Sequence, residues 1–109
     1  MKISTAYENG RLTVRLSGEL DHHGARGSMS EVDRLIDHRL PHDLFLDLSG
    51  LSFMDSSGIA LILRIHKRMR ELDGRLWVIN PTAQPQRVID AAGIDRLVPI
   101  SNGVREVIT

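Results

Sequence analysis

The apolar residues of this chain fall into short segments whose spacing alternates between that of strands and that of helices. Near the start, residues 3–7 and 11–16 flank Asn9-Gly10, and the second of these segments alternates apolar with polar residues. This pattern predicts a β-hairpin, because Asn-Gly favours the two-residue hairpin turn. We expect the second strand to end at Ser17-Gly18 and a polar turn to occupy residues 19–24.

A helix and a strand are predicted next. Met29, Val32 and Leu35 share one helical face, which is typical of an amphipathic helix. Gly24 and Gly27 do not favour a helix, since glycine is a poor helix former, so the pattern does not define the residue at which this helix begins. Residues 44–48 are a short, almost continuously apolar segment, which predicts a strand that is covered on both faces.

The longest helical pattern follows a polar turn at residues 51–57. Apolar residues recur at helical spacing over residues 59–72, and Asp73-Gly74 ends the pattern. The first half of this helix is apolar nearly all round, which predicts that it is buried. The second half is basic, as is favourable near the C-terminus of a helix.

Shorter elements complete the pattern. Residues 75–79 predict a strand with Trp77 in the core, and residues 86–92 predict a short helix that Gly93 closes. Residues 97–100 are a candidate strand, and residues 104–108 are a candidate for a last helical turn or two.

This order of elements predicts an α/β fold. We expect one domain over residues 1–109, with a mixed, mostly parallel sheet, an N-terminal antiparallel hairpin and about four helices. The length agrees, because a chain of this size holds one hydrophobic core. The functional crevice of such sheets tends to lie beyond the carboxyl ends of the strands. We therefore expect residues 18–24 and 51–57 to meet there.

Composition and charge narrow the class of protein. Hydrophobic residues make up 41% and charged residues 26%, as in ordinary globular domains. The 14 basic and 14 acidic residues balance, so the basic excess typical of direct nucleic-acid binding is absent. There is neither a membrane-spanning apolar run nor a signal-peptide pattern, which predicts a cytoplasmic protein without membrane contact. The lack of cysteine excludes disulfides, thiolate metal sites and cysteine nucleophiles.

The candidate chemistry lies at the start of the long helix, in Asp55-Ser56-Ser57-Gly58. Aspartate and serine are favoured N-cap residues, and replacing such a cap by alanine typically costs about 1 kcal/mol. Capping therefore explains one of these side chains but not a second serine. The N-terminus of a helix concentrates unpaired amide hydrogens and partial positive charge. A functional role for the two hydroxyls is thus the alternative to a capping cluster.

Two motifs together resemble the STAS domains, and among them the anti-sigma factor antagonists that control the first forespore sigma factor of spore-forming bacteria. The first motif is Leu16-Ser17-Gly18-Glu19-Leu20-Asp21-His22-His23, and the second is Leu51-Ser52-Phe53-Met54-Asp55-Ser56-Ser57-Gly58. Ala92-Gly93-Ile94 is similar to the step after the third helix in that family. The resemblance covers nearly the whole chain, but Gly24 and Gly27 depart from it at the start of the first helix.

The resemblance implies a protein-level switch that is not an enzyme and needs no cofactor or metal. In that family a partner that is both serine kinase and anti-sigma factor phosphorylates the first serine of Asp-Ser-Ser-Gly, which is Ser56 here. The unphosphorylated antagonist binds this partner and releases the sigma factor, and a phosphoserine phosphatase restores it. By position, the implied partner-binding residues are Glu19, Asp21, His22, Asp55, Ser57 and Gly58.

Other functions stay open for the same residues. Ser56 with His22 or His23 suggests a small hydrolase, although the Gly-x-Ser-x-Gly elbow is absent. His22-His23 with Asp21 suggests a metal site, although no His-Glu-x-x-His spacing is present. Glu19 and Asp21 invite comparison with phospho-acceptor receiver domains, whose aspartyl acceptor has no counterpart at a strand end here. The main alternative is a STAS module of a stress-signalling or membrane-transport assembly.

Overall fold

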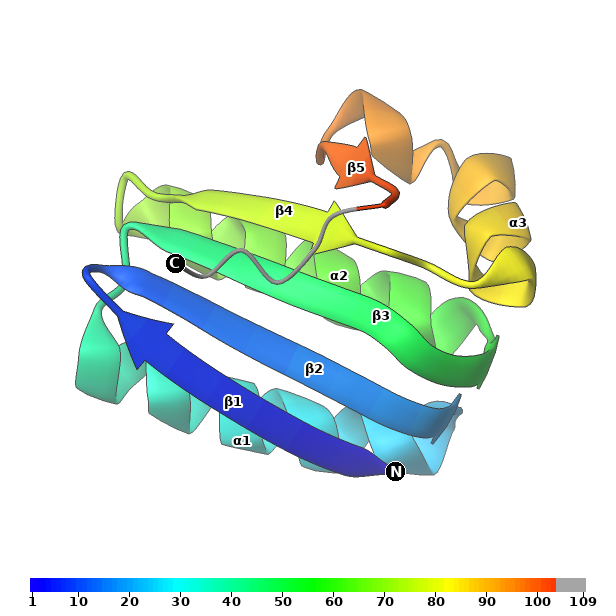
Figure 1. Cartoon of the computed structure of the whole chain (residues 1–109), viewed down its shortest axis with the longest axis horizontal. Coiled ribbons are helices and arrows are strands. Elements are labelled where there is room, and N and C mark those ends of the chain that lie inside the picture. The colour runs from blue at the N-terminus through cyan, green and yellow to red at the C-terminus, as the bar shows by residue number, and fades with distance from the viewer. Residues whose placement is uncertain (104–109) are drawn as a thin grey trace.

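A five-stranded sheet in the order β1-β2-β3-β4-β5 carries the long helices α1 and α2 on one face (Figure 1). The strands are β1 (Lys2–Glu8), β2 (Arg11–Leu20), β3 (Asp43–Met54), β4 (Arg75–Ile79) and β5 (Ile100–Ser101). The helices are α1 (His22–Arg39), α2 (Ser56–Glu71) and α3 (Ala83–Ala92), and a 3-10 turn follows at Ile94–Arg96. The computed structural model describes residues 1–103, so the helical turn predicted at residues 104–108 lies outside the described residues.

The predicted hairpin and parallel sheet are confirmed. β1 and β2 pair antiparallel, and the other neighbouring strands pair parallel. Asn9 and Gly10 form the hairpin turn with φ angles of 49° and 82°, which asparagine and glycine adopt more readily than other residues. Because β2, β3 and β4 run parallel, their carboxyl ends lie at one edge of the sheet.

The core lies between the sheet and the two long helices. Leu44, Leu46 and Leu48 of β3 are fully buried, whereas Phe45 between them is only partly buried. The prediction that this strand is covered on both faces is therefore wrong, because α1 and α2 cover one face. The prediction that Trp77 lies in the core also needs correction, since it is half-buried and lies beside Phe45, with the ring centroids 6.0 Å apart.

The segments around the candidate site are more regular than predicted. β2 continues to Leu20 and α1 begins at His22, so residues 19–24 do not form the expected polar turn. β3 likewise runs on to Met54, far past Leu48. The pairing of β2 with β3 continues to the ends of both strands, past register shifts at which β3 carries the extra residue. Such pairing between distant segments has no local sequence signal.

Smaller differences concern the other helices. α3 begins at Ala83, earlier than predicted, and only Ile100–Ser101 of the last candidate strand pairs with β4. The first half of α2 is not buried all round, because Ala60 is exposed and Leu63 is 39% exposed. α2 is amphipathic because it packs on the sheet with one face only.

Candidate functional site

The carboxyl ends of β2 and β3 bring the two polar motifs together. Glu19 pairs with Phe53 and Leu20 with Met54 in the parallel register. The Asp55 amide then donates to the Leu20 carbonyl at 3.3 Å, so α1 and α2 begin side by side. The predicted meeting of the two segments at this edge of the sheet is confirmed.

Ser56 is the first residue of α2 and is exposed. The N-cap is Asp55, whose Oδ1 accepts a hydrogen bond from the Ser57 amide at 2.8 Å. Neither serine is therefore the N-cap. Within residues 1–103 the hydroxyl of Ser56 has no hydrogen-bond partner, so the local structure gives it no stabilising role.

The neighbouring helix begins in the same way. Asp21 is the N-cap of α1, and its Oδ1 accepts a hydrogen bond from the Gly24 amide at 2.8 Å. This bond to the carboxylate is the main reason why the pKa of Asp21 lies below its ordinary value. Glu19, Asp21 and His22 are all exposed. The structure thus places these three predicted residues at the same edge as Ser56.

Gly58 lies in the first turn of α2 and is buried. A Cβ atom at this position would lie 2.2 Å from Met54 Cγ and 3.0 Å from Leu20 Cδ2. The absence of a side chain therefore lets α2 start directly against the ends of both strands. This is a packing role, and the predicted contact of Gly58 with a partner stays a prediction.

Two residues that the sequence motifs missed hold the end of β3. Gln84 Oε1 accepts from the Met54 amide at 2.8 Å, and Gln84 Nε2 donates to the Met54 carbonyl at 3.0 Å. The Thr82 hydroxyl donates to the Leu51 carbonyl at 2.6 Å. These contacts fix the backbone just before Asp55. They join residues 30 or 31 positions apart, so no local pattern reveals them.

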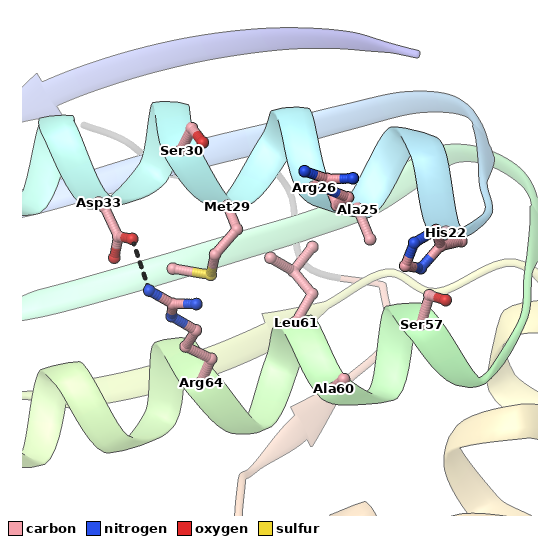
Figure 2. Close-up of a pocket in the computed structure, with 10 residues that line it drawn as sticks. All are labelled: His22, Ala25, Arg26, Met29, Ser30, Asp33, Ser57, Ala60, Leu61 and Arg64. Atoms are coloured by element: carbon pink, nitrogen blue, oxygen red, sulfur yellow. Dashed lines mark hydrogen bonds and ion pairs between the residues drawn. The ribbon is translucent and has the colours of Figure 1, made fainter.

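A groove of about 350 Å³ runs between α1 and α2 from this edge (Figure 2). His22 and Ser57 face each other at one end of it, as Figure 2 shows. At the other end Arg64 donates to Asp33 at 3.2 Å. The second serine of the motif thus lines the groove, whereas Ser56 is not among the lining residues.

The alternative sites gain no support from the geometry. No group of three or more histidine, aspartate or glutamate side chains in the described part of the chain is arranged to hold a metal ion. No hydrogen bond joins Ser56 to a histidine within residues 1–103, so a triad would lack the contact between nucleophile and base. None of the described helices combines the length and apolar character that crossing a membrane requires.

Comparison with known proteins gives consistent matches. Residues 2–107 match the family model of the STAS domain. An anti-sigma F factor antagonist of Paenibacillus polymyxa is 35% identical over 100 residues, which cover 92% of this chain and 86% of that protein. Another, of Lysinibacillus sphaericus, is 37% identical over 86 residues, which cover 76% of this chain and 71% of that protein.

The solved structures of the anti-sigma factor antagonist SpoIIAA share the fold at 24% identity. The unphosphorylated form aligns with a TM-score of 0.84 over 96% of this chain and 90% of that chain. The phosphorylated form aligns with a TM-score of 0.76 over 96% and 94%.

Proposed function

Because the chain belongs to the STAS domain family, we propose that it is an anti-sigma factor antagonist whose partner binding is switched by phosphorylation of Ser56. The unphosphorylated form binds a cytoplasmic partner that is both anti-sigma factor and serine kinase, and so releases the sigma factor. A phosphoserine phosphatase returns the modified protein to this form. The relatives at 35% and 37% identity are anti-sigma F factor antagonists, which supports a partner of that type and a role in sporulation.

The exposed position of Ser56 carries this proposal. Its hydroxyl projects from the first residue of α2, while Asp55 makes the cap. A kinase can reach this hydroxyl without unfolding the helix. Glu19, Asp21 and His22 lie at the same edge and Ser57 at the mouth of the groove, which supports them as partner contacts.

Phosphorylation at this position affects binding more than folding. A phosphoserine adds about −1.5 to −2 charges. At the N-terminus of a helix such a charge is favourable by about 0.3 to 1 kcal/mol, and the nearby carboxylates of Asp55, Asp21 and Glu19 oppose it. In a docked interface, however, an unpaired dianion costs several kcal/mol. A loss of about 2.7 kcal/mol already weakens binding roughly a hundredfold.

The direct test is peptide mass spectrometry after incubation with ATP and the anti-sigma kinase encoded in the same genome. We expect one phosphoryl group on Ser56, none in Ser56→Ala, and normal modification of the matched control Ser49→Ala, which removes an exposed serine of β3 outside the motif and the groove. The phosphorylated protein should then bind the kinase about a hundredfold more weakly than the unmodified protein. If a kinase that is active on another substrate leaves Ser56 unmodified, the switch is refuted and a stress-signalling or transport assembly becomes the better explanation.

A further inference from the structure

Charge is distributed unevenly over the molecule. Although the whole chain is neutral, α1 and α2 together carry seven basic and four acidic side chains. The basic ones are Arg26, Arg34, Arg39, Arg64, Lys67, Arg68 and Arg70, and the acidic ones are Glu31, Asp33, Asp37 and Glu71. The edge of the sheet at Ser56 instead carries the carboxylates of Glu19, Asp21 and Asp55. The helix layer is therefore positive next to a negative edge.

Ion pairs neutralise most of the carboxylates between the two helices. Asp33 accepts from Arg64 at 3.2 Å and from Arg68 at 2.7 Å, and Arg68 also pairs with Asp37. Arg26 differs from Arg64 and Arg68, because its exposed side chain has no ion pair within residues 1–103. It lines the groove near His22 and Ser57, as Figure 2 shows. This end of the groove thus presents an unpaired positive charge.

The hollow beside Arg26 results from small side chains. Ala25 of α1 faces the groove, as do Ser57 and Ala60 of α2, while Met29 and Leu61 form an apolar floor. These side chains leave room between the helices close to their N-termini.

Gly27 adds a separate observation on the same helix turn. It is exposed inside α1, and a Cβ atom there would have no neighbour within 4 Å. Glycine is among the poorest helix formers, so the packing of this fold gives no reason for it. A position without a side chain does allow the backbone of another protein to approach closely.

We propose that the groove between α1 and α2, with Arg26 at its rim, receives an acidic segment of the anti-sigma partner. An apolar side chain of that segment fills the hollow over Met29 and Leu61. The carboxylates of the segment pair with Arg26 and with Arg64, whose side chain is 62% exposed. Charge complementarity selects this occupant, because the free charge at the groove is positive. The inference rests on the proposed function and extends the contact surface beyond the edge at Ser56.

This surface also orients the partner. A partner that carries an acidic segment and separate basic groups fits this charge distribution in one orientation only. In that orientation its acidic segment lies over the helices and its basic groups lie over the carboxylate-rich edge. Ser57 lines the groove, and Ser56 is the residue before it. A partner seated in the groove therefore lies next to the hydroxyl of Ser56 that is to be phosphorylated.

The test measures binding of the unphosphorylated protein to the nucleotide-loaded anti-sigma kinase by calorimetry at two salt concentrations. Arg26→Glu should weaken binding at least tenfold and reduce its salt dependence. The matched control is Arg87→Glu on α3, since Arg87 is exposed and does not line the groove, and it should bind like the wild type. A second variant, Ala60→Phe, should also weaken binding, because it fills the hollow from an exposed position.

Amide resonances of Arg26, Gly27 and Ser30 should broaden when the partner is added to the isotope-labelled protein. The inference is overturned if the wild type binds and both groove variants bind equally well, with broadening confined to residues 19–21 and 53–57. Self-association of the wild type that Arg26→Glu abolishes would also overturn it, because the occupant would then be a second copy. A wild type that neither binds the kinase nor is phosphorylated refutes the proposed function itself, and the two failures are thereby distinguished.

Discussion

Replacing Gly27 and Gly58 separately by alanine should change the free energy of unfolding in opposite directions. At Gly27 the new methyl group meets no atom within 4 Å, so the substitution should act through helix propensity and stabilise by about 0.5 to 1 kcal/mol. At Gly58 the methyl carbon would lie 2.2 Å from Met54 Cγ and 2.6 Å from its Sδ. Met54 is fully buried, and overpacking of this kind typically costs about 1 to 3 kcal/mol.

Urea unfolding followed by circular dichroism measures both effects, and each variant controls for the other because the added atoms are the same. The midpoint should rise for Gly27→Ala and fall for Gly58→Ala at an unchanged slope. In thermal unfolding, about 1 kcal/mol corresponds to roughly 4 to 8 °C in Tm for a domain of this size. A Gly58→Ala protein as stable as the wild type, or a destabilised Gly27→Ala protein, would refute the packing argument on which the start of α2 rests.

Two further predictions concern the backbone around the site. Gln84→Ala removes both hydrogen bonds to the Met54 backbone and should cost about 1 to 3 kcal/mol in urea unfolding. Gln86→Ala loses only exposed hydrogen bonds, to Asp90 and from Asn102, and should be nearly neutral, so equal midpoints would contradict this. The pKa of Asp21 is lowered in the fold by the Gly24 amide. The ionised carboxylate therefore stabilises the fold at a pH above the pKa of about 3.9 in the unfolded chain, and this stabilisation is lost as the pH falls through the lower pKa of the folded state. Asp21→Asn should therefore lose less stability than the wild type between pH 6 and pH 3, and parallel losses would rule out this linkage.

Local sequence patterns determined the order and type of the strands and α-helices in the described part of the chain, but not the 3-10 turn at Ile94–Arg96. The hairpin turn at Asn9-Gly10, the helical spacing after Ser57 and the alternation of strand with helix each depend on residues close together in the chain. The Asp-Ser-Ser-Gly motif is also local, but it indicates Ser56 only together with the motif at residues 16–23. The predictions of the hairpin, the long helix and the alternating elements were correct because short-range geometry decides them, whereas the role of Ser56 stays a prediction.

Tertiary contacts decided how far the elements extend and what the site looks like. β2 and β3 lengthen each other by pairing Leu20 with Met54, and Gln84 holds that end from a third segment of the chain. This pairing places Asp55 as the cap and leaves Ser56 exposed, which composition and periodicity do not indicate. The one-sided cover of the sheet and the groove between α1 and α2 likewise exist only after packing, because they depend on which surfaces distant residues bury against one another.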